Sequence, residues 1–221
     1  SGAFVLYGLR ANTGTSVTWT AASNNIGGTV ANSIQNNSTS TTAQTFGMFT
    51  GNAPCVFTSN VVRNITAAGG TGTGTSASVI GISNSGASSA NHTISLNTIS
   101  SLSNTNASAA VTVTGLMFGS STGTNSINKN FIHSLSVVSS SASATVNGIS
   151  INSGTATYAN NMIRLGIDNA GTSLASGIVI NGINETVAGT NNFYHNSVYV
   201  GGSGVGGTAN TFAFNSTITT N

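Results

Sequence analysis

The sequence predicts an all-β protein, a parallel β-helix (β-solenoid) of about six coils with a repeat of about 33 residues. Three observations support this fold. A phrase of one apolar residue, two variable residues, Asn, another variable residue and an aliphatic recurs, most clearly at 94–99 and 127–132. A second phrase, Gly followed by apolar residues, recurs between its copies. Ser, Thr, Asn and Gly dominate while only 3% of the residues are charged, which disfavours helices and favours short strands with bends.

The Asn phrase is expected to form a strand in every coil. Looser copies run 29–34, 61–66, 162–167 and 193–198, and Leu165 stands in the Asn position of one of them. Stacked Asn side chains can hydrogen-bond to each other between coils and tolerate a left-handed corner. We therefore predict an Asn ladder that is interrupted at Leu165. Its members are expected to be Asn32, Asn64, Asn97, Asn130 and Asn196.

Apolar residues of the same phrase should continue up the core as two columns. The first is expected to contain Val61, Ile94, Ile127, Met162 and Phe193, and the second Ile34, Thr66, Ile99, Ile132, Ile167 and Val198. Each column follows from stacking the coils at the strand spacing of about 4.8 Å.

The Gly phrase is expected to mark a second strand on another part of each coil. Its copies begin at Gly8, Gly47, Gly81, Gly115, Gly148 and Gly177, and the segment 211–214 keeps the spacing without a Gly. Gly at the same position of successive repeats suggests a bend in the backbone, or a place where a side chain would collide with the next coil.

The chain is interpreted as one β-solenoid domain over residues 1–221, without an interdomain linker. Its coils are predicted at roughly 1–28, 29–60, 61–93, 94–126, 127–161, 162–192 and 193–221. The Ser/Thr/Ala/Gly-rich segments between the phrases are expected to be loops. No run reaches the ~18–20 apolar residues of a membrane-spanning helix, so membrane insertion is not predicted.

Charge and cysteine content exclude several classes of partner. Four Lys/Arg against two Asp/Glu give a net charge of +2, too little for the basic face that nucleic acid requires. The single Cys55 excludes an internal disulfide framework and is interpreted as a buried thiol. The three histidines, His92, His133 and His195, fall at different phases of the repeat. We therefore expect neither a metal site nor a cofactor.

Catalysis is not expected. The two acids, Asp168 and Glu185, could form a catalytic pair for cleaving polysaccharides only if the loop that carries Glu185 folds back. Solvated loop acids, or ion pairs with Arg164, are the preferred interpretation. A polysaccharide-degrading enzyme is kept as the weakest alternative.

One column of the repeat is rich in basic residues. The position before the Asn carries Ala31, Arg63, Leu96, Lys129, Arg164 and His195. Stacked cations ~4.8 Å apart repel each other by about 1 kcal/mol in water, so the column should face solvent or a partner. Two interpretations stay open. In one, the column consists of outward side chains that cover the outer surface of the solenoid. In the other, Arg63, Lys129, Arg164 and His195 form a basic seam that binds another subunit or an acidic polysaccharide.

The segments 160–168 and 191–199 resemble repeats of long secreted bacterial surface proteins with right-handed parallel β-helices, in which an apolar-x-x-Asn-x-apolar phrase recurs. The resemblance covers most of residues 29–215. It implies a right-handed helix and an extracellular or cell-surface location. Its motif is specific for architecture and not for activity, because that fold hosts adhesins, filaments and enzymes.

The ends of the chain suggest self-assembly. No polar cap is evident, and both ends fall at the same phase, on the Gly strand. Tyr7 and Leu9 at one end and Phe212 and Phe214 at the other are expected near a subunit junction. The leading hypothesis is a non-enzymatic subunit that assembles head to tail into an extracellular filament or sheath. The alternative is a carbohydrate- or surface-binding segment of a larger secreted adhesin.

Overall fold

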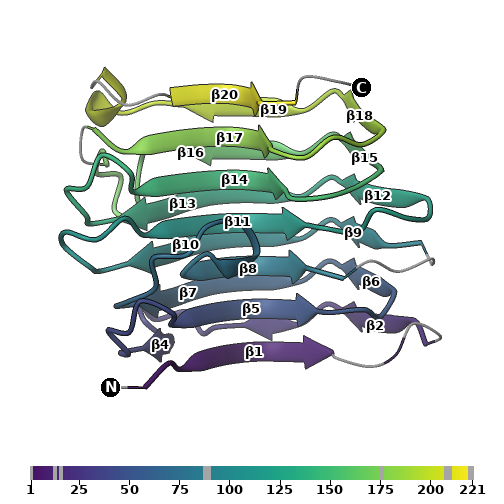
Figure 1. The fold of residues 1–221 in the computed structure, drawn as a ribbon, viewed down its shortest axis with the longest axis horizontal. Coiled ribbons are helices and arrows are strands. Elements are labelled where there is room, and N and C mark those ends of the chain that lie inside the picture. Colours follow the sequence, from purple (N-terminus) through teal and green to yellow (C-terminus); the bar gives the residue numbers. More distant parts are fainter. Residues whose placement is uncertain are drawn as a thin grey trace.

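The computed structural model describes residues 2–11, 14, 17–86, 91–174, 177–206 and 211–218. Its strands stack as a β-solenoid of about 6 turns, with paired strands about 34 residues apart in sequence (Figure 1). The predicted fold class is therefore confirmed. The strands join three sheets that run the length of the stack, and strands of consecutive coils pair in parallel.

The first sheet contains the Gly phrase. Its strands, in spatial order, are β1 (Val5–Ala11), β5 (Gln44–Thr50), β8 (Val79–Asn84), β11 (Thr112–Phe118), β14 (Thr145–Ile151), β17 (Val179–Glu185) and β20 (Thr211–Ser216). The second sheet contains β2 (Trp19–Ala22), β6 (Cys55–Thr58), β9 (Thr93–Ser95), β12 (Asn125–Asn128), β15 (Ala156–Ala159) and β18 (Asn191–Tyr194).

The third sheet completes each coil. It contains β3 (Asn25–Ile26), β7 (Val61–Ala67), β10 (Thr98–Asn104), β13 (Phe131–Val137), β16 (Met162–Leu165) and β19 (Ser197–Val200), with β4 (Ile34–Asn36) also paired to β7. In the part of the chain that the structure describes, two short 3-10 helices lie in loops, η1 (Gly74–Ser76) and η2 (Ser203–Gly206). Among the described residues no helix is long and apolar enough to cross a membrane.

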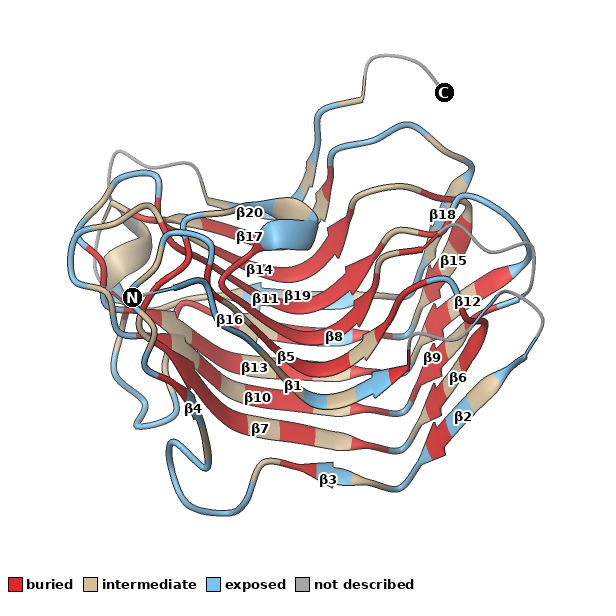
Figure 2. Ribbon diagram, turned by 60° about the horizontal axis from the view of Figure 1, so that its bottom comes forward, coloured by how far each residue is buried: buried red, intermediate tan, exposed pale blue. Residues whose placement is uncertain are grey.

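The core lies between the three sheets and is continuous from coil to coil. In Figure 2 the buried stretches of successive strands line up as bands across each sheet, and the outermost strands are paler. Every residue of β11 is buried, whereas β20 is largely exposed. Burial of aliphatic side chains in these bands is the main force that holds the stack together.

The two predicted apolar columns exist, but with partly different members. The column of the second sheet consists of Ala21, Phe57, Ile94, Ile127, Tyr158 and Phe193. The column of the third sheet consists of Ile26, Val62, Ile99, Ile132, Ile163 and Val198. Val61 and Met162 belong instead to a separate column. Ile34 pairs with Ile65, and Thr66 pairs with Gln35, so they lie three and four strand positions beyond the Val62 column. The placement of these four residues, and of Ile167 in place of Ile163, was wrong.

The Gly column is a site of close approach between coils. A Cβ on Gly81 would lie 2.6 Å from the Gly115 carbonyl oxygen and 2.5 Å from Ile99 Cγ2. Only Gly fits such a position, because the contact with a backbone oxygen cannot be relieved by a side-chain rotation. In the sixth coil the column passes through Gly182, which lies against Gly148, and not through Gly177 as predicted.

Candidate functional site

An Asn ladder runs through all six complete coils at the corner between the second and third sheets. Each pair is joined by a side-chain hydrogen bond of 2.9–3.0 Å between Nδ2 of the earlier Asn and Oδ1 of the later one. The members are Asn24, Asn60, Asn97, Asn130, Asn161 and Asn196.

Inside the stack both the donor and the acceptor groups of each ladder side chain are hydrogen-bonded. The backbone N–H and the Nδ2 group of Asn97 both donate to Asn130 Oδ1, at 3.1 and 2.9 Å, and Nδ2 also donates to the Phe57 carbonyl oxygen. Asn97 and Asn130 are each 1% exposed. Buried amides of this kind must be satisfied, so the ladder fixes the register between coils.

The left-handed corner belongs to the residue before each ladder Asn. Ser59, Leu96 and Lys129 have φ values of 57°, 59° and 55° there. Ser23, Asn160 and His195 take the same conformation in the other coils. The sequence prediction had placed this backbone conformation at the Asn itself, and that assignment was wrong for the ladder.

Three of the five predicted ladder residues, Asn97, Asn130 and Asn196, are members, and two are not. Asn64 pairs in register with Ser101 and donates from Nδ2 to the Gly28 carbonyl oxygen. Asn32 accepts a hydrogen bond from Thr66. Both have positive φ. Leu165 does not interrupt the ladder, because Asn161 supplies the amide in that coil.

The cause of these errors is the variable length of the coils. Successive ladder residues are 36, 37, 33, 31 and 35 positions apart. A constant period counted back from Asn97 falls on Asn64 and misses Asn60. The phrase itself was the better signal, because Phe57-Thr58-Ser59-Asn60-Val61-Val62 matches it fully.

The predicted basic seam is divided between two columns. Lys129 and His195 occupy the exposed corner before the ladder. Arg63 and Arg164 lie on the third sheet, in a column where Ser100 and His133 stand between them and Tyr199 follows. A continuous cationic stripe is therefore absent from these four positions. Burial and the nearby Arg164 lower the pKa of His133, which keeps it neutral at pH 7.

The four predicted junction residues lie at opposite ends of the first sheet. Its edge strands are β1, which carries Tyr7 and Leu9, and β20, which carries Phe212 and Phe214. Through the strand register Tyr7 and Phe212 belong to one column, which faces outward. Leu9 and Phe214 belong to another, which faces the core. Phe212 and Phe214 are 38% and 44% exposed.

At the C-terminal end of the stack the core opens into a cavity of about 440 Å³. Its walls include Ile183, Phe193, Val198 and Phe214, together with the last ladder residue, Asn196. The end is stepped, because β20 adds a seventh strand to the first sheet while the second and third sheets stop at β18 and β19. These apolar side chains are those that another coil would cover.

The two carboxylates have separate hydrogen-bond networks. Asp168 accepts from the backbone N–H groups of Ala170 and Thr172, at 2.9 and 2.8 Å. Glu185 is 4% exposed and accepts from Asn191 and Ser216, so it is not the solvated loop acid that the sequence suggested. Asp168 lies in the segment between β16 and β17, Glu185 is the last residue of β17, and no residue that the structure describes is hydrogen-bonded to both.

Cys55 is buried, as predicted, beside a histidine and an amide. Its Sγ lies 3.4 Å from His92 Nδ1, and the backbone N–H of Cys55 donates to the same nitrogen. Burial raises the pKa of the Cys55 thiol to about 12, against a smaller opposing effect of the hydrogen bond from Asn84. Burial also lowers the pKa of His92 to about 4. At pH 7 both groups are neutral, so the thiol is not activated as a nucleophile.

Metal binding finds no support in the part of the chain that the structure describes, where no group of three or more His, Cys, Asp or Glu side chains could hold an ion. In comparisons with known proteins, no family model, no curated protein and no solved structure matches this chain.

Proposed function

We propose that the protein is a non-enzymatic structural subunit of an extracellular filament or sheath, in which copies add head to tail along the stack axis. The observation that carries this proposal is the match between the two ends of the first sheet. Its edge strands, β1 and β20, occupy the same position in the coil and carry apolar residues in the same columns.

A second copy that continues the register would pair its β1 with β20. Tyr7 would then lie over Phe212, and Leu9 over Phe214. The first contact repeats an arrangement already present inside the chain, where the rings of Tyr7 and Phe46 stack with centroids 5.1 Å apart. Continuing the sheet would also pair the open N–H and C=O groups of both edge strands.

The ends of the Asn ladder favour the same polarity. Within the chain the earlier Asn supplies the donors and the later Asn supplies the acceptor oxygen. Asn196 is the last member and Asn24 the first among the described residues, so one end of the ladder offers donors and the other an acceptor. Head-to-tail addition keeps this polarity the same in every copy, whereas head-to-head addition would reverse it. The ladder itself is not bonded across the junction, because the second and third sheets stop one layer below β20.

The stepped end predicts a junction weaker than the contacts inside the chain. A copy whose β1 pairs with β20 continues only the first sheet, because β18 and β19 end one layer lower. Association through one sheet of three should depend on protein concentration. With a net charge of +2 and 3% charged residues, it should depend little on salt.

The non-enzymatic part of the proposal is supported by the placement of the potential catalytic groups. Asp168 and Glu185 are held in separate networks, and the Cys55 thiol is buried with a raised pKa. The extracellular part is supported by the resemblance of the repeats to those of secreted surface proteins.

Sedimentation velocity over a range of protein concentrations, together with electron microscopy, tests the assembly. We expect rods of growing length whose width equals that of one stack. Phe212→Lys should weaken association by about tenfold or more, because a charge on the edge strand opposes pairing. Val138→Lys is the matched control, since Val138 is 60% exposed and follows β13 in the middle of the stack. Monodisperse monomers at high concentration, or equal effects of both variants, would contradict the proposal.

A further inference from the structure

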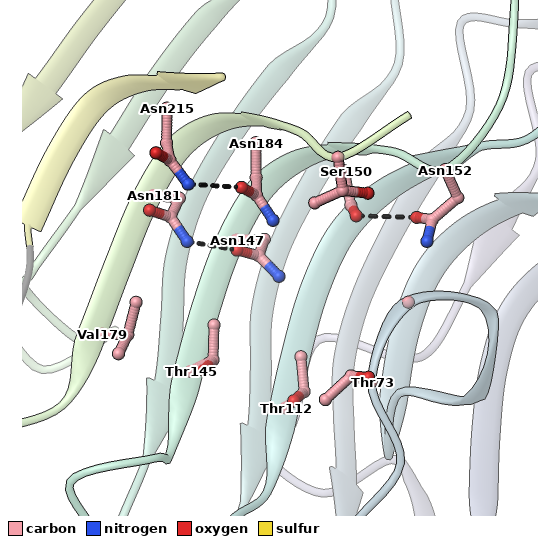
Figure 3. A pocket seen from close by; sticks show the side chains of 12 residues that line it. Thr73, Thr112, Thr145, Asn147, Ser150, Asn152, Val179, Asn181, Asn184 and Asn215 are labelled. Carbon is pink, nitrogen blue, oxygen red and sulfur yellow. Dashed lines mark hydrogen bonds between the residues drawn. The ribbon is translucent and has the colours of Figure 1, made fainter. Parts of the chain in front are cut away.

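A groove of about 410 Å³ lies on the outer face of the first sheet, over its C-terminal half. Outward side chains of β11, β14, β17 and β20 form its floor (Figure 3). The loop that contains η1 crosses the same face and contributes Thr73 and Gly74 as a wall. Gly74 has φ +56°, and a Cβ there would lie 2.4 Å from Asn152 Nδ2, so the loop packs closely on the sheet at this point.

The floor of the groove is polar, although one of its columns is apolar nearer the N-terminus. The column that contains Tyr7, Phe46 and Ile80 in the first three coils continues with Asn147 and Asn181. The neighbouring column continues with Asn184 and Asn215, whose carboxamides are joined by a hydrogen bond of 2.9 Å. Figure 3 shows both Asn pairs side by side, in two parallel rows.

The first row is not saturated. Asn181 Nδ2 donates to Asn147 Oδ1 at 3.0 Å, but the next position of the column is Phe212, which offers no donor. Asn181 Oδ1 is buried without a hydrogen-bond partner in the described part of the chain, and so is Thr112 Oγ1 on the same floor. The two residues are 4% and 2% exposed. Most buried polar atoms in proteins are hydrogen-bonded, so these two atoms leave unused hydrogen-bonding capacity on the floor of the groove.

The chemistry of the groove selects the class of ligand. None of its lining residues is charged, so it has no group to neutralise an anion or a cation. An apolar ligand would leave the amides unpaired. Amides and hydroxyls that both donate and accept match a ligand with many neutral hydroxyl groups. The amide rows repeat at the strand spacing of about 4.8 Å, which is comparable with the length of one pyranose unit in an extended glycan.

We propose that this groove binds a neutral polysaccharide chain, aligned with the stack axis, through Asn147, Asn181 and Thr112 on one side and Asn184 and Asn215 on the other. The site is separate from the proposed basic seam and from the core-facing junction residues. It does not depend on filament formation, because every lining residue belongs to a single chain.

Isothermal titration with neutral hexasaccharides built from glucose, xylose or mannose tests the proposal, with hexagalacturonic acid as an anionic comparison. At least one neutral series should bind, and its affinity should not change between low and high salt. Asn181→Leu and Thr112→Val should each lower the affinity about tenfold, because each removes a hydrogen bond to the sugar. Circular dichroism would verify that the variants keep the fold.

Asn128→Leu is the matched control. Asn128 lies on β12 of the second sheet, where its Nδ2 donates to Ser126 at 2.6 Å, and its replacement should leave affinity unchanged. Failure of every neutral series to bind would overturn the proposal. Binding that survives both groove substitutions, or that is stronger for the acidic chain and falls with salt, would overturn it as well.

Discussion

The inner Asn ladder and the outer row of Asn147 and Asn181 are both stacks of asparagines, but their hydrogen bonding differs. In the inner ladder, from Asn24 to Asn196, each interior amide both donates to one coil and accepts from another. In the outer row, Asn147 and Asn181 make one bond between them, and Asn181 Oδ1 has no partner among the described residues. Saturated amides hold coils in register, whereas unsaturated amides remain available to a ligand. The same residue type, stacked in the same way, can thus serve structure or binding.

The largest difference in stability should appear between variants in which one asparagine of the inner ladder or of the outer row is replaced by alanine. Asn130→Ala leaves the backbone N–H and Nδ2 of Asn97 without an acceptor in the core, and should lower the free energy of unfolding by about 4 kcal/mol. Asn147→Ala should cost about 1 kcal/mol, because water in the groove can replace the lost bond. Urea denaturation measures both. Similar losses in the two variants would abolish the distinction between the rows.

Acid should act on the interior without involving either row, because amides do not titrate. The folded pKa of His92 is about 4, against 6.5 for an unperturbed histidine. The unfolded chain therefore binds a proton first, and stability present above pH 6.5 should fall as the pH drops towards 4, by about 3 kcal/mol. His133, whose pKa is also lowered, should add a smaller loss in the same direction. Urea midpoints measured from pH 7.5 to 4 test this effect, and His92→Gln should remove most of it.

The ladder assignment can be tested at two positions four residues apart. Asn60 is a buried member of the ladder, and Asn60→Gly should lower the free energy of unfolding by about 3 kcal/mol. Asn64 lies outside the ladder at φ +55°. Asn64→Gly should change stability by less than about 1 kcal/mol, since relief of the left-handed conformation offsets one lost hydrogen bond. Thermal unfolding of both variants decides between the structural assignment and the constant-period one.

The smallest expected effect on stability is that of Asn181→Leu. This change removes the unpaired oxygen together with the one hydrogen bond to Asn147. The relief of the unpaired oxygen offsets the lost bond, so the unfolding free energy should change by less than about 1 kcal/mol. The same variant should lose affinity for the neutral glycan. A loss of stability as large as that of Asn130→Ala would place Asn181 among the residues that hold the stack together.

The sequence predicted the architecture because strand phrases and composition are local signals. The recurring Asn and Gly phrases gave a parallel β-helix of about six coils, and Asn97, Asn130 and Asn196 were assigned to the ladder directly. Asn24, Asn60 and Asn161 were missed because the loops vary in length, which shifts the phase of a constant period. Matching the phrase afresh in each coil would have found Asn60 and Asn161.

The outer groove was less accessible to sequence reasoning. Its signal is the pair Asn-Gly-Ile at 147–149 and 181–183, one coil apart. This repeat was missed because Gly177, and not Gly182, was assigned to the Gly column in that coil. Neither the η1 loop that walls the groove nor the unpaired state of Asn181 Oδ1 can be derived from residue types, since both depend on how distant segments meet.

The hydrogen bonds of the inner ladder all point the same way along the chain, with donors in the earlier coil and the acceptor in the later one. A polypeptide that leaves the ribosome or a secretion channel with its N-terminus leading would complete its coils in that order. Each finished coil would hold two unfilled donors until the next asparagine arrived to receive them. The ladder thus gives the growing end a template for one more turn, so that folding can proceed vectorially, at the pace of synthesis or export.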